Sequence, residues 1–278
     1  MPAIALRLCL ALLLCGAAAP ATAAAPARIV SLNLCADQLI LALADRAQIA
    51  ALTRFVKDPS LSAAAAEARD VPVADSSAEA VLALRPDLIV ANPGFAMGRI
   101  AALTGGRYRV VELPAAESHA EIVANIRTVA AAVGHPARGE AMIRRMDAEL
   151  AAIPVLKGAR VAAYYQRRGF LSGTGTLMDE LMRRAGLRNL AGVLGKGPLS
   201  RLSIEELVAS RPDYLIVDSD SDRVVDHGTE MLHHPALAAI PRLRLPQAWT
   251  VCGGPAYVQA ARSLAAQMRP AHPGGARH

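Results

Sequence analysis

Short apolar runs alternate with amphipathic segments along the first half of the chain. Apolar residues dominate the stretches 28–32, 49–53, 88–91 and 107–113, and polar, Pro or Gly residues bound each of them. Such runs predict buried parallel strands, because a strand that is covered on both faces carries few polar positions. Amphipathic segments separate several of the runs, for example the one from Asn33 to Ala44. This alternation predicts an α/β lobe over residues 28–134.

The second half of the chain begins with a purely helical pattern and then returns to alternation. Between residues 118 and 153 apolar residues recur at helical spacing on both sides of an interruption at Gly134-His135-Pro136. We therefore expect a long connecting helix over residues 135–156. Alternation restarts at Arg160 and predicts a second α/β lobe over 157–269, with strands at 161–165 and 248–251, a turn at 169–175 and a last helix at 257–268. The Pro- and Gly-rich residues 270–278 predict a flexible tail.

One sequence pattern occurs twice. Residues 77–90 and 203–216 share six identical positions, among them Glu79 and Glu205 and the Arg-Pro-Asp tripeptides that begin at Arg85 and Arg211. In each copy a Ser can cap a short helix, and the Pro ends that helix because it disfavours helical geometry in the preceding residue. An apolar run that predicts a strand follows. Two copies of one helix–strand unit indicate two similar lobes with a cleft between them.

The N-terminus is typical of a secretion signal. Arg7 precedes an apolar stretch over residues 8–14, and small residues follow over 17–25. We expect residues 1–25 to be a signal peptide that is cleaved near Ala23, so that the mature protein is exported to the periplasm. Lipid attachment at Cys15 is the weaker alternative, because Leu14 stands where a small residue is expected.

Charge and cysteine content narrow the function classes. The 278-residue chain carries a net charge of +6, but its basic residues are scattered and do not form the stripe expected of a nucleic-acid-binding protein. After export only Cys35 and Cys252 remain of the four cysteines. An exported protein with two thiols can form one disulfide. The alternative is that both are unpaired small side chains that line a pocket.

The sequence carries no motif for catalysis or for a metal site. His233-His234 lies in a segment that resembles a helix start. The acidic loop that begins at Asp218 lacks the Gly and the Glu that a calcium loop needs at its sixth and twelfth positions. The nucleophile-elbow, phosphate-binding-loop and zinc-protease motifs are also missing from the sequence. We therefore expect no enzyme, no metal ligands from the protein and no resident cofactor.

Several of these segments together resemble a known family. In order, they are the strand with Ser31-Leu-Asn-Leu-Cys-Ala-Asp-Gln-Leu, the two Arg-Pro-Asp units around a connecting helix, and Trp249-Thr-Val-Cys-Gly-Gly-Pro. They resemble the substrate-binding proteins of ABC importers for ferric siderophores, haem or cobalamin, over residues 28–268. The resemblance implies an α/β fold with two Rossmann-like lobes joined by a rigid helix and a ligand cleft between them. It also implies docking onto an ABC permease dimer through Glu79 and Glu205. The alternative for each Glu is a local role at the N-terminus of its own helix. We expect the protein to be a monomer.

The candidate ligand-binding residues follow the predicted strands. Ligands of open α/β lobes bind outside the carboxyl ends of the strands. The rings of two candidates, Tyr165 and Trp249, would suit a large planar ligand, and Arg54 and Arg167 would pair with ligand carboxylates. An ordinary surface charge is the alternative for each Arg, and a place in the core is the alternative for Trp249. The full set is Asn33, Cys35, Arg54 and Asn92 in the first lobe and Tyr165, Gln166, Arg167, Trp249 and Cys252 in the second.

The sequence leaves the ligand open among an iron–siderophore, haem and cobalamin. The aromatic residues expected of a cobalamin binder before each repeat helix are missing from residues 74–76 and 198–200. Two other functions stay open as alternatives. One is a sensor or accessory ligand-binding protein without a transport role, and the other is an enzyme on the same scaffold, since a fold does not determine a function.

Overall fold

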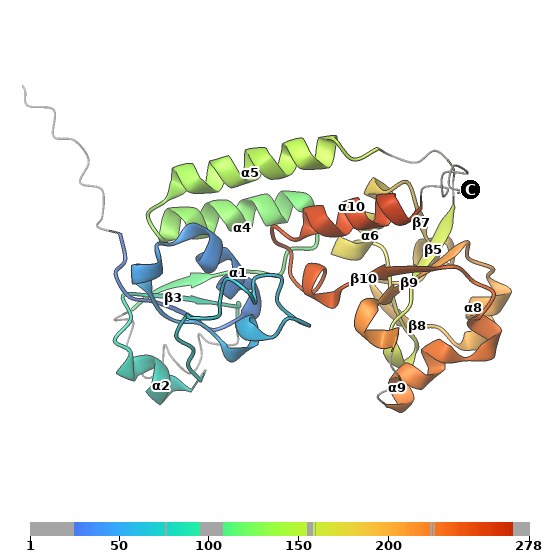
Figure 1. Ribbon diagram of the computed structural model, residues 1–278, viewed down its shortest axis with the longest axis horizontal. Helices are drawn as coiled ribbons and strands as arrows, with labels where there is room; N and C mark the ends of the chain where they lie inside the picture. Colours follow the sequence, from blue (N-terminus) through green and yellow to red (C-terminus); the bar gives the residue numbers. More distant parts are fainter. Residues whose placement is uncertain are drawn as a thin grey trace, which may run out of the picture.

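The first lobe is a parallel sheet with helices on both faces (Figure 1). The computed structural model describes residues 25–75, 77–94, 108–154, 158, 160–222, 224 and 226–268. The sheet has the strand order β2-β1-β3-β4. Residues of α1 share a core with one face of the sheet, and Val81 of α2 packs with the other face. The elements are β1 (Ile29–Ser31), α1 (Leu34–Leu43), β2 (Ile49–Ala51), α2 (Ala78–Ala83), β3 (Leu88–Ala91) and β4 (Arg109–Glu112).

The second lobe repeats this architecture. Its parallel sheet has the order β10-β9-β5-β7, and an antiparallel pair, β6 with β8, lies beside it. Helices α6 and α10 cover one face of the sheet, and α7 and α8 cover the other. The elements are β5 (Val161–Tyr164), β6 (Phe170–Ser172), α6 (Leu177–Arg184), β7 (Arg188–Asn189), α7 (Leu190–Val193), β8 (Leu199–Arg201), α8 (Ile204–Ala209), β9 (Tyr214–Asp218), α9 (His227–Glu230), β10 (Arg242–Leu245) and α10 (Tyr257–Gln267).

Two long helices lead from the first lobe to the second. Helix α4 (His119–Ala132) and helix α5 (Pro136–Ala151) pack against each other above the first sheet, and α5 runs back towards the second lobe (Figure 1). Helix α5 lies within residues 135–156, the range predicted for the connecting helix. One apolar core continues from α1 through α4 and α5 to α6 and α10. The lobes are therefore packed together along this side and are not merely tethered.

The repeated sequence unit serves the same structural purpose in both lobes. Ser77 caps α2 and Ser203 caps α8, each by accepting a backbone N–H three residues later. The Asp of each Arg-Pro-Asp tripeptide then binds the start of the central strand. Asp87 accepts the N–H groups of residues 27 and 28 at 2.7 and 3.0 Å, and Asp213 accepts the N–H of Val161 at 2.7 Å. The motif thus joins a helix end to the first strand of its own lobe.

Two predictions for the second lobe are wrong. Residues 248–251 do not form a strand, because a 3₁₀ helix spans Gln247–Trp249 and a turn follows. The strand is β10, at the edge of the sheet, in which more exposed Arg residues alternate with buried Leu residues because successive side chains of a strand point to opposite faces. The predicted turn at 169–175 contains β6, a short strand that pairs with β8 and not with the main sheet.

The predicted ends of the chain lie mostly outside the described residues. This holds for the signal peptide up to residue 24 and for the whole tail, residues 270–278. Within the described part of the chain, none of the helices combines the length and apolar character needed to cross a membrane.

Candidate ligand cleft

A pocket of about 400 Å³ lies at the carboxyl ends of the strands of the second lobe. Tyr164 ends β5 and Gln166 follows it, while Gln247 and Thr250 follow β10. Glu117, in the segment between β4 and α4, lines the pocket on the side of the first lobe. The lining residues are Glu117, Tyr164, Gln166, Ser172, Thr176, Leu177, Met178, Pro198, Leu199, Gln247, Thr250 and Val251.

The lining combines uncharged polar groups with exposed apolar side chains. Amide and hydroxyl groups come from Gln166 and Gln247 and from Ser172, Thr176 and Thr250. The apolar part includes Leu199, which is 68% exposed, and Val251, which is 41% exposed. Among the described residues that line this pocket there is no Arg, Lys or His, and Glu117 is the only carboxylate. The pocket can therefore donate and accept hydrogen bonds without offering a positive charge.

A smaller pocket of about 180 Å³ lies next to it and shares Gln166 and Gln247. Arg167 lies at this smaller pocket, and its guanidinium is bound to the carboxylate of Asp226. Asp218 also lines it, and partial burial raises the pKa of that carboxyl group. Because Asp226 already neutralises Arg167, this Arg does not present a free charge to a ligand carboxylate.

The candidate residues of the first lobe lie on its surface or in a helix cap. Asn33 caps α1, and its Oδ1 accepts the N–H of Ala36 at 2.8 Å. The guanidinium carbon of Arg54 lies 5.1 Å from the centre of the ring of Phe55, and Phe55 is itself 45% exposed. Asn92 is exposed directly after β3. The structure does not bring these residues into either pocket described above.

The two aromatic candidates do not present open faces to a ligand. Tyr165 is fully buried, and its hydroxyl donates to the carbonyl of Leu202 at 2.9 Å, inside the second-lobe core. Successive residues of a strand point to opposite faces, so the preceding Tyr164 lines the larger pocket, whereas Tyr165 contributes to the lining of the smaller one. Trp249 is half-buried against the main core and is not among the residues that line the pockets. The prediction placed a strand at 248–251, which the structure does not contain, and so misjudged where this ring points.

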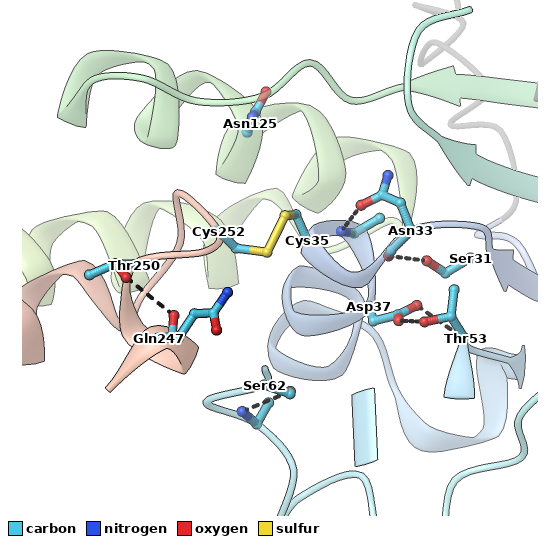
Figure 2. Close-up of a disulfide and its surroundings, with 12 residues drawn as sticks. Ser31, Asn33, Cys35, Asp37, Thr53, Ser62, Asn125, Gln247, Thr250 and Cys252 are labelled. Atoms are coloured by element: carbon cyan, nitrogen blue, oxygen red, sulfur yellow. Dashed lines mark hydrogen bonds between the residues drawn. A yellow bond between two sulfur atoms is a disulfide. The ribbon is translucent and has the colours of Figure 1, made fainter. Parts of the chain in front are cut away.

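A disulfide between Cys35 and Cys252 joins the two lobes (Figure 2). Cys35 is in the first turn of α1, and Cys252 is in the turn between β10 and α10. The Cα atoms of the two residues are 5.3 Å apart although 217 positions separate them in the sequence. Val251, the neighbour of Cys252, lines the larger pocket. The bond therefore fixes the distance between the lobes close to this pocket, and neither cysteine is among the residues that line the two pockets.

A buried carboxyl group lies two residues after Cys35. Asp37 has no exposed surface, and its oxygens accept the hydroxyl of Thr53 at 2.5 Å and the N–H of Thr53 at 3.2 Å (Figure 2). Burial raises the pKa of Asp37 from 3.8 to about 6, although hydrogen bonds from Ser31 and Thr53 oppose this rise. This group connects α1 to the end of β2 and does not line either pocket, so its role is structural.

Most of the chain matches a known protein family. Residues 29–244 match the model of the family described as periplasmic binding protein. The chain belongs to this family. A cobalamin-binding protein of Halobacterium salinarum is 28% identical over 206 residues, which are 72% of this chain and 56% of that protein. The chain thus spans little more than half the length of this curated relative.

Solved structures share the two-lobed fold. The periplasmic haem-binding protein RhuT from Roseiflexus sp. RS-1 is 25% identical with a TM-score of 0.68, over 86% of this chain and 96% of that one. The periplasmic haem-binding protein HutB of Vibrio cholerae is 20% identical with a TM-score of 0.71, over 87% and 99% of the two chains. A possible iron-binding, periplasmic solute-binding protein of Staphylococcus epidermidis is 16% identical with a TM-score of 0.71, over 89% and 100%.

Sequence reasoning missed several residues of the larger pocket. Gln247 and Thr250 follow β10, and this strand was not predicted because its Arg and Leu residues alternate. Leu199 lies in the stretch where an aromatic residue was expected, and its exposed apolar side chain lines the pocket. Glu117 lies in the segment between β4 and α4, and no sequence motif around it indicates a binding role. The rule that ligands bind after the carboxyl ends of strands would have found the first two, given the correct strand.

Proposed function

We propose that this periplasmic binding protein is the substrate-binding component of an ABC importer and captures a large metal chelate of the siderophore, haem or cobalamin type. In this proposal the chain is exported as a monomer, binds no nucleic acid and catalyses no reaction. It binds its ligand in the cleft and delivers it to a membrane permease. The observation that carries the proposal is the pocket at the carboxyl ends of the second-lobe strands, at the place where the lobes meet.

The chemistry of the pocket favours a corrinoid over the other two ligand types. Haem carries two propionates, and many ferric siderophores are anionic, so both would need free cationic side chains in the cleft. The described pocket residues offer one Arg, Arg167, and Asp226 neutralises it. A corrin ring instead carries many uncharged amides at its edge. Gln166 and Gln247 can exchange hydrogen bonds with such amides, and Leu199 can pack on the ring. The name of the Halobacterium relative supports this choice.

Calorimetric titration of the purified protein tests the ligand. We expect cyanocobalamin to bind more tightly than haem or a ferric trihydroxamate. Gln247→Ala should weaken cyanocobalamin about three- to tenfold, the usual cost of one lost hydrogen bond. Arg167→Ala is the matched control in the smaller pocket and should leave that affinity unchanged, because Asp226 already occupies the guanidinium. Tighter binding of haem, together with its loss in Arg167→Ala, would contradict the choice of a corrinoid.

Docking onto the permease is proposed for one carboxylate on each lobe. Glu79 is in the first turn of α2 and Glu205 is in the first turn of α8, and both side chains are exposed. Hydrogen bonds from its own backbone N–H and from Ser203 keep the pKa of Glu205 below its usual value, so this group is ionised at neutral pH. Two equivalent exposed carboxylates on equivalent helices can meet two equivalent cationic sites of a permease dimer.

A further inference from the structure

Two helix N-termini from different lobes meet beside the larger pocket. Helix α4 begins at His119 and helix α6 begins at Leu177. Glu180 of α6 accepts the N–H of His119 with its Oε2 at 2.7 Å, and Glu117 before α4 accepts the N–H of Leu177 with its Oε2 at 3.0 Å. Each helix start is thus bound by a carboxylate that comes from the side of the other helix. This reciprocal pair crosses the junction of the lobes.

The physical reason for this pairing is the charge at a helix start. The first N–H groups of a helix have no partner within the helix, and the aligned peptide dipoles add a partial positive charge there. Such a helix start attracts anions. At the start of α6 the side chain of Thr176 accepts the N–H of Asp179, and Glu117 accepts the N–H of Leu177. A carboxylate of the protein therefore already occupies the place where an anionic group of a ligand would be attracted.

Glu117 also belongs to the pocket itself. It is one of the residues that line the volume of about 400 Å³, and so are Thr176 and Leu177 at the start of α6. The other polar groups of this lining are uncharged amides, hydroxyls and the phenol of Tyr164. No cationic side chain among the described lining residues compensates Glu117. The negative charge of Glu117 therefore interacts electrostatically with any ligand group that approaches this end of the pocket.

We propose that Glu117 sets the charge preference of the cleft by occupying the start of α6 and repelling ligand carboxylates from it. The inference rests on the proposed function, because it requires a ligand in this pocket. It predicts that a neutral amide is accepted where the corresponding carboxylate is rejected. Glu117 then has two roles at once, since it binds a helix of the second lobe and selects the ligand through the same carboxylate.

The substitution that tests this role is Glu117→Gln. Gln has nearly the same shape as Glu, and its amide oxygen can still accept the N–H of Leu177, so only the charge is removed. Glu112→Gln is the matched control. Glu112 is the exposed last residue of β4, lies five positions earlier and does not line either pocket. Both variants change the net charge by the same amount, so long-range effects on binding cancel in the comparison.

The probes are cyanocobalamin and its monocarboxylates, in which one peripheral amide at a time is replaced by a carboxylic acid. Calorimetric titration at pH 7.5 gives the ratio of the two dissociation constants for each isomer and each protein. We expect at least one isomer to bind the wild type about tenfold more weakly than cyanocobalamin, the size of one repulsion between partly screened charges. Glu117→Gln should reduce this penalty to about threefold or less. Glu112→Gln should preserve the tenfold penalty.

The outcomes separate the inference from the function on which it rests. If the wild type does not bind cyanocobalamin, both the choice of a corrinoid and the role of Glu117 are overturned. If the wild type binds cyanocobalamin but shows the same acid-to-amide ratio as Glu117→Gln, only the role of Glu117 is overturned. An equal loss of the penalty in Glu112→Gln also overturns it, because the effect then comes from net charge and not from this position.

Discussion

Removing the disulfide between Cys35 and Cys252 should lower the free energy of unfolding by several kcal/mol. The perturbation is the double variant Cys35→Ser and Cys252→Ser, which keeps the size of both side chains. The bond closes a loop between residues 217 positions apart. In the chain-entropy model a loop of this length restricts the unfolded chain by about 5 kcal/mol. Residual structure in the unfolded state reduces this value, so we expect a loss of about 3–5 kcal/mol.

The folded state should survive this loss because the lobes share more than the disulfide. One apolar core passes from α1 through α4 and α5 to α10, and Glu117 and Glu180 bind helix starts across the lobe junction. The variant should therefore still bind cyanocobalamin, which serves as the control for correct folding. The loss of stability arises mainly because the unfolded chain gains conformational entropy without the disulfide, and the folded state changes little.

Urea unfolding followed by circular dichroism measures the difference, with oxidised wild type and the double variant under identical conditions. Wild type in the presence of a reductant is the second control and should unfold at the urea concentration of the variant. A difference below about 1 kcal/mol would refute the argument from loop length. Alkylation of unreduced, unfolded wild type followed by mass spectrometry tests the bond itself, and two labelled cysteines would show that it does not form.

Two further predictions concern docking and pH. The double variant Glu79→Ala and Glu205→Ala should bind ligand like the wild type but fail to stimulate the ATPase of the reconstituted importer, because the exposed carboxylates lie on α2 and α8 and not in the cleft. Asp37→Asn should stabilise the protein above pH 7 by up to about 3 kcal/mol and have little effect below pH 4, measured by urea unfolding. Burial raises the folded-state pKa of Asp37 to about 6 from 3.8, so wild-type stability falls as the pH rises through this window.

Each of these predictions has a control and a contradicting result. For docking, Glu67→Ala removes an exposed carboxylate elsewhere on the first lobe and should leave stimulation intact. Normal transport by the double variant at Glu79 and Glu205 would exclude the docking role. For Asp37, the control is the same measurement at pH 4, where the side chain is protonated in the folded state. An equal effect of the substitution at pH 4 and at pH 7.5 would show that shape or hydrogen bonding to Thr53, and not ionisation, is responsible.

Local patterns predicted the buried elements well and the exposed ones poorly. The strands β1, β3 and β9 are mostly apolar because they lie inside their sheets and helices cover both faces of each sheet, so hydrophobicity alone indicates them. The strand β10 lies at the edge of its sheet and alternates Arg with Leu, so a search for apolar runs passed over it. That single error moved the predicted strand to 248–251 and placed Trp249 in the cleft.

The sequence by itself determined the family, the two α/β lobes and the repeated helix–strand unit, because these depend on residues that are close together along the chain. Only the tertiary structure decided which side chains share the cleft. Tyr164 and Tyr165 are adjacent in the sequence, but strand geometry turns them to opposite faces of the sheet, so that Tyr164 lines the larger pocket and Tyr165 packs in the core on the other face. Glu117 meets the start of α6 sixty residues away. Such a contact depends on how the lobes pack, and no local pattern of residues encodes it.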